Sequence, residues 1–223
     1  MPAITNVEFR RFSANHHNAQ RNWLLVILNT DNPNISGIGD ASPMEDDDLV
    51  MAMIEAMVQK HLSGKDPLES EVHWTNLYQD FQARGGRIAS TALSGIDIAL
   101  WDLKGKLLDQ PVWKLLGGAH RKKIRVYANG WYTNPGTPEQ NAEEAKIVID
   151  KGYTALKFDP FGQDNFYKLS LQESQLAEER VAAVRESVGP FVDILVEAHA
   201  KFNVMNAIQI GKRLEEYLSL IHI

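Results

Sequence analysis

The stretch DILVEAHAKFN, residues 193–203, decides the fold class of the second half of the chain. Its apolar run has the length and β-branched content of a buried strand, and Glu197 and His199 follow at the end of that run. Asn203 stands directly before a segment with apolar residues at helical spacing, which is the position of an N-cap residue. The stretch therefore predicts a strand over 193–199 that leads into a helix.

The same alternation of strand and helix extends to both sides of this stretch. Strands are expected over 123–130 and 153–159, and capping-box patterns open helices at Thr137 and Ser170. Residues 219–223, SLIHI, have the character of the beginning of a fourth strand. Strands that alternate with helices through short connections predict parallel β/α units, as in a barrel or a doubly wound sheet.

Four ionisable side chains fall at the carboxyl ends of two of the predicted strands. Because side chains alternate along a strand, Lys157 and Asp159 share one face, and Glu197 and His199 share the equivalent face of the next strand. Ligands of parallel β/α proteins bind at the carboxyl ends of the strands, so these four residues are the candidate site. A structural alternative is a polar rim in which Lys157 pairs with Asp159, and Glu197 hydrogen-bonds His199.

The first half of the chain has a different organisation. Antiparallel strands are expected over 4–12, 22–30 and 36–43, and helices follow them, of which 88–108 has the most regular apolar spacing. Gly95 weakens that helix, and we expect close packing on a neighbouring element to explain its presence.

Composition excludes several classes of protein. The chain has 223 residues, a formal net charge of −6 and no cysteine, so it holds neither a disulfide framework nor a thiolate metal site. No apolar stretch is long enough to cross a bilayer, and the first residues lack the pattern of a signal peptide. Basic residues are scattered, which argues against nucleic acid and anionic membranes as partners. We therefore expect a soluble cytoplasmic protein.

Two parts of the chain resemble the mandelate racemase/muconate lactonizing enzyme-like branch of the enolase superfamily. ALSGIDIALWDLKGKLLDQPVWKLLGG, residues 92–118, is similar to the helix and turn that join the capping domain of that family to its barrel. YTALKFDPFG, residues 153–162, and DILVEAHAKFN resemble the second and third barrel strands of its acid-sugar dehydratases. The resemblance implies an α+β capping domain over residues 1–118. A partial (β/α)8 TIM-like barrel with about three βα units would follow over residues 119–223.

The resemblance also implies a chemistry, the Mg²⁺-assisted abstraction of the proton next to a substrate carboxylate to give an enediolate. Glu197 occupies the position of the family's third-strand metal ligand, although aspartate is commoner there. His199 occupies the position of a histidine that protonates the departing hydroxyl. Lys157 matches the first lysine of a Lys-x-Lys pair, whose second position here is Asp159. Because an aspartate favours charged lysine, we expect Lys157 to hold the substrate carboxylate or to stabilise the enediolate.

Loops of the capping domain close over such sites in this family, and the segments 15–21 and 40–44 correspond to them. The residues that these segments offer for contact with a substrate are His16, His17, Arg21 and Met44. The alternative for each is an ordinary polar or apolar residue on a surface loop.

The leading hypothesis is the N-terminal portion of a Mg²⁺-dependent acid-sugar dehydratase, a hydro-lyase that acts on a small-molecule sugar acid. A complete barrel takes about 250 residues by itself. We therefore expect a truncated chain that lacks the other metal ligands and the base, and that is inactive alone. The alternatives are a racemase or epimerase of a 2-hydroxy or sugar acid, with Lys157 as one of two bases, and a non-catalytic truncated product. We expect the full-length form to assemble as a homo-oligomer.

Overall fold

The computed structural model describes residues 2–16, 19–42, 46–81, 86–162 and 169–222. The chain divides into two compact units, Met1–Lys122 and Lys123–Ile223, whereas the sequence places the boundary after residue 118. Each unit has a hydrophobic core of its own, so each is described by itself. None of the helices within the described ranges is long and apolar enough to cross a membrane.

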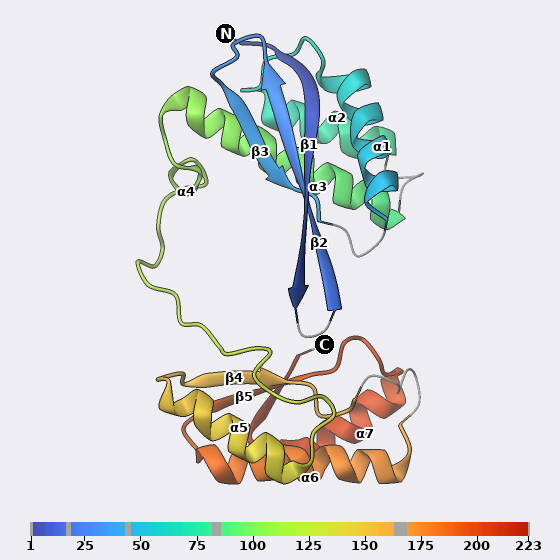
Figure 1. Cartoon of the computed structure of the whole chain (residues 1–223), viewed down its shortest axis with the longest axis vertical. Helices are drawn as coiled ribbons and strands as arrows, with labels where there is room; N and C mark the ends of the chain where they lie inside the picture. The colour runs from blue at the N-terminus through green and yellow to red at the C-terminus, as the bar shows by residue number, and fades with distance from the viewer. Residues whose placement is uncertain (1, 17–18, 43–45, 82–85, 163–168, 223) are drawn as a thin grey trace. The chain divides into compact units, whose positions relative to one another are not determined.

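The first unit is built on a three-stranded antiparallel sheet. Its strands, in the order β1-β2-β3, are Ile4–His16, Ala19–Thr30 and Ser36–Asp40. Figure 1 shows β1 and β2 as a long hairpin, which continues farther than the sequence predicts, up to the pair His16 and Ala19. Burial alternates along β2, where Leu24, Val26 and Leu28 are completely buried, so one face of the sheet forms the core.

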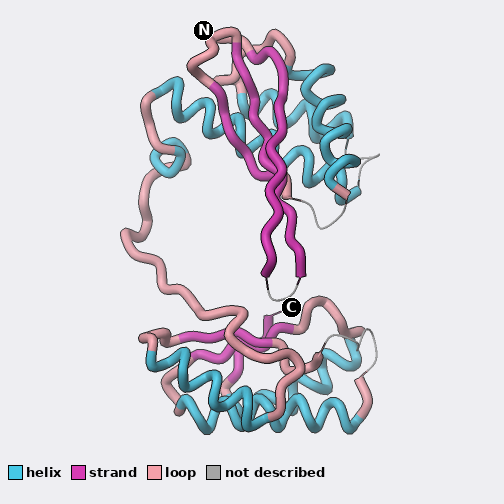
Figure 2. The backbone as a smooth tube through the Cα atoms, viewed as in Figure 1, coloured by secondary structure: helices cyan, strands magenta, loops and turns pink. Residues whose placement is uncertain are grey.

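Helices cover that face of the sheet (Figures 1 and 2). They are α1 Asp47–Met57, continued by the π-helical turn η1 Val58–Leu62, then α2 Ser70–Phe81 and α3 Gly86–Leu108. The short α4 Val112–Leu115 follows α3 and has no buried residue. The Asp46 side chain begins α1 by accepting a hydrogen bond from the Asp48 backbone amide. The helix predicted over 88–108 is confirmed by α3, whose apolar stripe enters the core.

Glycines allow α3 to lie close to β3. A Cβ atom added to Gly39 would lie 2.0 Å from the carbonyl oxygen of Gly95, and one added to Gly37 would lie 2.1 Å from that of Ala99. In the other direction, a Cβ atom on Gly95 would lie 2.5 Å from the Cβ atom of Ala41. Close packing therefore explains Gly95, as expected from the sequence, and the strand glycines are its counterpart.

An ion-paired carboxylate joins α2 to η1. Asp80 accepts a hydrogen bond from Lys60 Nζ at 2.5 Å, and its Oδ2 atom lies 2.7 Å from Nε2 of His61. The hydrogen bond from Lys60, followed by that from His61, lowers the pKa of Asp80 to about 2. The carboxylate therefore stays ionised well below the usual range of aspartate.

We expect Asp80→Asn to remove an acid-sensitive part of the stability of the first unit. The folded-state pKa lies below the ordinary value of 3.8, so this contribution is complete above that pH and is lost as the pH falls through about 2. The melting temperature of the unsubstituted protein should exceed that of Asp80→Asn at neutral pH, and the gap should shrink between about pH 4 and pH 2. Thermal melts across this range check the result, with Glu55→Gln on the exposed side of α1 as control. A gap that does not change with pH would contradict it.

The second unit is a three-stranded parallel sheet, in the order β4-β5-β6, with its helices on one face (Figure 2). Its elements are α5 Pro138–Asp150, β4 Ala155–Phe158, α6 Leu171–Val188, β5 Asp193–Glu197, α7 Val204–Leu214, the 3-10 turn η2 Glu215–Tyr217 and β6 Ser219–His222. The capping boxes at Thr137 and Ser170 and the N-cap at Asn203 are all confirmed. β6 also confirms that a strand begins after residue 218, although it is the third strand of this sheet and not the fourth.

The strand predicted over 123–130 is wrong except at one residue. Ala128 alone of this segment pairs, through a parallel bridge to Leu156 on β4. The apolar side chains that suggested a strand, Ile124 and Val126, are 76% and 62% exposed. Because Ala128 is the one buried residue of the segment, packing does not stabilise an extended ladder along it.

An arginine fastens the amino ends of the strands in this unit. Arg185 on α6 donates to the carbonyl oxygens of Gly189 at 2.7 Å and Val192 at 2.8 Å, directly before β5. It also donates to those of Tyr217 at 2.8 Å and Leu218 at 3.2 Å, directly before β6. One guanidinium thus joins the starts of two strands to the helix that covers them.

Arg185→Met is expected to lower the free energy of unfolding by about 2–3 kcal/mol, because several carbonyl groups lose a charged donor at once. Urea denaturation followed by circular dichroism measures this. Arg213→Met is the matched control: Arg213 forms a surface ion pair with Glu178 at 2.8 Å, a kind of contact worth about 1 kcal/mol or less. Similar losses for the two variants would show that the carbonyl contacts of Arg185 contribute little.

Candidate active site at the strand ends

The four ionisable residues predicted from the sequence come together in the second unit. Lys157 belongs to β4 and Glu197 ends β5, while Asp159 and His199 follow these strands. Lys157 Nζ donates to Glu197 Oε2 at 2.6 Å, and Nδ1 of His199 lies 3.0 Å from Oδ2 of Asp159. The four side chains therefore converge at the carboxyl ends of two adjacent parallel strands.

The pairing crosses between strands, unlike the structural alternative drawn from the sequence, which paired Lys157 with Asp159. The register sets Phe158 of β4 opposite Val196 of β5, so Asp159 and Glu197 leave the sheet side by side. Lys157 and Glu197 are thus diagonal neighbours on the two strands, and the long Lys157 side chain spans this separation to reach Glu197 Oε2.

Glu197 is buried at this rim and is ionised. Its Oε2 accepts from Lys157, and its Oε1 accepts from the His199 backbone amide at 3.0 Å. Burial by itself raises the pKa of Glu197. The hydrogen bonds from Lys157 and His199, with their charges, outweigh burial and lower the pKa overall. The rim thus presents a carboxylate beside an ammonium group.

Asp159 is more deeply enclosed and contacts a residue that sequence reasoning missed. Its side chain is 2% exposed, and Oδ2 accepts from Lys201 Nζ at 2.6 Å. Lys201 follows the turn at His199 and Ala200, beyond the end of β5, so strand alternation in the sequence did not mark it. The position of Asp159 makes it a partner of His199 and Lys201 rather than a group open to a ligand.

His199 lies in a turn and not in the strand predicted over 193–199. β5 ends at Glu197, and His199 and Ala200 both have positive φ, 49° and 53°. The turn leaves the His199 side chain 55% exposed while Nδ1 contacts Asp159. His199 is therefore held on one side and accessible on the other.

Aromatic residues from the segment before α5 lie next to these groups, and sequence reasoning missed them as well. Trp131 Nε1 donates to the Lys157 carbonyl oxygen at 2.9 Å, and Lys157 Nζ lies 5.7 Å from the centroid of the Tyr127 ring. Burial raises the pKa of the Tyr132 hydroxyl, and the charges of Asp159 and Glu197 act in the same direction. Aromatic rings thus line one side of the rim.

Comparison with known proteins identifies the family. Residues 6–117 match the family model for the mandelate racemase/muconate lactonizing enzyme N-terminal domain, and residues 140–222 match the enolase C-terminal domain-like model. The chain belongs to the enolase superfamily. Its capping domain and partial barrel are therefore those implied by the resemblance in sequence.

Relatives within the enolase superfamily include named dehydratases. The D-gluconate dehydratase of Thermoproteus tenax is 49% identical over 155 residues, covering 69% of this chain and 31% of the relative. The D-gluconate/D-galactonate dehydratase of Picrophilus torridus is 36% identical, covering 87% of this chain and 49% of the relative. A solved enolase superfamily member from Salmonella Typhimurium is similar with a TM-score of 0.85 at 35% identity, over 97% of this chain and 60% of that one. The chain thus spans half or less of these two curated relatives.

The substrate contacts predicted in the capping domain fall where side chains are not described. His17 and Met44 lie outside the described residues. Arg21 lies in β2, and His16 ends β1, but the described side chains do not include theirs. The contribution of these residues to substrate binding stays a prediction.

Members of the enolase superfamily generally use Mg²⁺, and the chemistry of the donors here fits part of such a site. Glu197 offers the hard carboxylate oxygen that Mg²⁺ prefers. Asp159 is enclosed, and its carboxylate contacts the Phe161 amide, His199 and Lys201. Across the described part of the chain, no three His, Asp or Glu side chains group as a metal site would require. Glu197 therefore fits as one ligand of a magnesium site and not as the whole of it.

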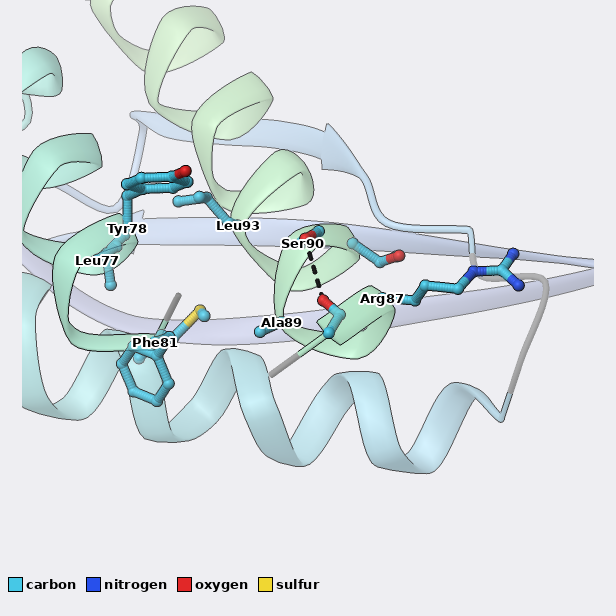
Figure 3. A pocket seen from close by; sticks show the side chains of 10 residues that line it. Leu77, Tyr78, Phe81, Arg87, Ala89, Ser90 and Leu93 are labelled. Carbon is cyan, nitrogen blue, oxygen red and sulfur yellow. Dashed lines mark hydrogen bonds between the residues drawn. The ribbon is translucent and has the colours of Figure 1, made fainter. Parts of the chain in front are cut away.

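A separate hollow of about 560 Å³ lies in the first unit between α2 and α3 (Figure 3). Leu77, Tyr78 and Phe81 line it from α2, and Ala89 and Leu93 from α3. Ser90, also in the lining, donates its hydroxyl hydrogen to the Gly86 carbonyl oxygen at 3.0 Å. The lining of this hollow is mainly apolar, so the rim of the second unit is the better candidate for chemistry.

Proposed function

We propose that this chain supplies two of the active-site strands of an acid-sugar dehydratase, in which His199 protonates the departing hydroxyl group. The observation that carries the proposal is the half-exposed His199 ring, which buried Asp159 holds through Nδ1 at the strand ends. The names of the relatives, dehydratases of D-gluconate, D-galactonate and D-xylonate, support a small sugar acid as substrate.

Dehydration of such an acid removes a proton from the carbon next to the carboxylate and hydroxide from the following carbon. Hydroxide leaves poorly, so a proton must reach it as the carbon–oxygen bond breaks, and the product is water. The Asp159 carboxylate accepts a hydrogen bond from Nδ1 of His199, which leaves Nε2 to hold and give this proton. The electron pair left on carbon forms a double bond, and the resulting enol tautomerises to a 2-keto-3-deoxy acid.

Lys157 and Glu197 would act at the carboxylate end of the substrate. Glu197 would be one ligand of Mg²⁺, which when bound would stabilise negative charge on the substrate carboxylate as the proton leaves. Lys157 carries a positive charge beside that position, 2.6 Å from Glu197 Oε2. Because it donates a hydrogen bond to a carboxylate, we assign it to substrate binding rather than to proton abstraction.

The test is to incubate the full-length protein with Mg²⁺ and D-gluconate, D-galactonate or D-xylonate in deuterated water. Formation of a 2-keto-3-deoxy acid, abolished by a chelator, is the expected result. If the recovered substrate has both configurations at the α-carbon and no keto acid forms, the result would contradict the proposal and indicate a racemase or epimerase. No reaction with any sugar acid would favour a non-catalytic protein. We expect the 223-residue chain alone to give no turnover, and the full-length form to be a homo-oligomer by light scattering.

A further inference from the structure

Lys201 is a buried cation that the proposed chemistry does not use. Its side chain is 4% exposed, and its Nζ donates to Asp159 Oδ2 at 2.6 Å and to the carbonyl oxygen of Gly162. A buried ammonium group loses its hydration, so it is tolerated only where contacts of this kind compensate for the loss. The main compensating group is the carboxylate of Asp159.

Asp159 is an acceptor shared by Lys201 and His199. Its Oδ1 accepts from the Phe161 amide at 2.9 Å, and its Oδ2 accepts from Lys201 and lies 3.0 Å from Nδ1 of His199. An ionised carboxylate only accepts hydrogen bonds, so the hydrogen in the last contact belongs to Nδ1. Asp159 is enclosed and thus acts on a ligand through the His199 ring, whose other nitrogen is Nε2.

The backbone between His199 and Lys201 is bent so that both side chains reach this carboxylate. In an extended strand, residues 199 and 201 would stand about 6.6 Å apart. Here His199 and Ala200 adopt φ values of 49° and 53°. The side chains of His199 and Lys201 consequently contact the same oxygen of Asp159. Left-handed conformations are unfavourable for residues with a Cβ atom and persist where surrounding contacts impose them, often at functional sites.

We propose that Lys201 is a positioning residue that, through Asp159, holds the His199 ring in one orientation, with Nε2 on the side away from Asp159. Without Lys201, the Asp159 carboxylate would keep the Phe161 amide but lose the ammonium group that contacts Oδ2. A buried carboxylate that loses such a contact shifts toward water, and the His199 ring would then lose the acceptor that orients it. The inference deepens the proposed function and rests on it for the role of His199, but the orientation itself can be measured without catalysis.

The first test measures the orientation of His199 in the 223-residue chain. Three-bond couplings about the Cα–Cβ bond of His199 should show one rotamer in the unsubstituted chain and in Lys201→Arg, which keeps the charge. They should be averaged over rotamers in Lys201→Met. The indole N–H of Trp131, which donates to the Lys157 carbonyl oxygen at 2.9 Å, reports whether the second unit is folded. Lys201→Gln, an uncharged donor, replaces Lys201→Met if that variant unfolds. A single His199 rotamer in either folded, uncharged variant would overturn the inference.

The second test separates positioning from general support of the fold in the full-length protein. Lys201→Met should slow dehydration by about 100-fold, the typical effect of a misplaced group, with little change in KM. Exchange of the α-proton with solvent, which does not need His199, should continue, and Lys201→Arg should restore most of the dehydration rate. Equal losses of exchange and dehydration would show a structural role and overturn the inference. If instead His199→Asn leaves dehydration intact, the proposed function fails while the rotamer result still stands.

Discussion

His199→Asn is expected to slow dehydration by the full-length protein about 10²- to 10⁴-fold, the range that general acids supply. Asparagine can donate a hydrogen bond toward Asp159, so the turn is preserved, but it cannot deliver a proton to the departing hydroxide. Removal of the α-proton does not involve His199. Deuterium should therefore continue to enter the recovered substrate while formation of keto acid nearly stops, and NMR of one reaction in deuterated water measures both rates.

A substrate with a different leaving group and a matched control variant test this prediction further. A substrate with chloride in place of the departing hydroxyl needs no proton to leave, so His199→Asn should process it at nearly the rate of the unsubstituted protein. His120→Asn is the control, because it changes an exposed histidine of the first unit. Loss of deuterium exchange together with dehydration would assign His199 to an earlier step than the one proposed here.

Gly39→Ala is expected to lower the free energy of unfolding by about 3 kcal/mol, the upper end of the usual range for an overfilled core. The added methyl group would lie 2.0 Å from the Gly95 carbonyl oxygen and 2.8 Å from the Ala99 nitrogen. Both are backbone atoms of α3 and cannot rotate aside, so the helix and β3 must separate. Leu100 and Leu103 of α3 are completely buried, so separation also loosens the core around them.

Gly152→Ala is the control for Gly39→Ala. Gly152 has φ of 90°, and nothing lies within 4 Å of an added Cβ atom. Its replacement introduces backbone strain of about 1–2 kcal/mol without a steric clash. Urea denaturation and thermal melts compare the two variants. If Gly39→Ala proves no less stable than Gly152→Ala, the approach of α3 to β3 is looser than the geometry indicates.

Local signals in the sequence were sufficient for much of the fold and for the place of the site. The capping boxes at Thr137 and Ser170 act within a single helical turn, so they can be read without knowledge of distant contacts. The alternation of side chains along β4 and β5 likewise predicted which of them point away from the helices, because the period of a strand does not depend on its neighbours. Lys157 and Glu197 were located in this way.

The remaining features depend on contacts between distant residues. The pairing of Lys157 with Glu197 follows from strand register, and the enclosure of Lys201 follows from a turn at positive φ that no residue type announced. Residues 123–130 have a strand-like composition, but composition does not show that a neighbour will bury them. The β1–β2 hairpin was underestimated because strand pairing can continue through residues without apolar alternation.

Arg185 has a consequence for how this part of the barrel could be altered. It ties the entrances of β5 and β6 to α6, at the ends of the strands opposite the ionisable rim. The contacts of Arg185 and the ionisable rim thus lie at opposite ends of the strands. The segments that leave β4 and β5 can therefore be exchanged for others without disturbing the contacts of Arg185. A graft of those exit segments from a relative with another sugar preference should then alter selectivity while preserving the melting temperature.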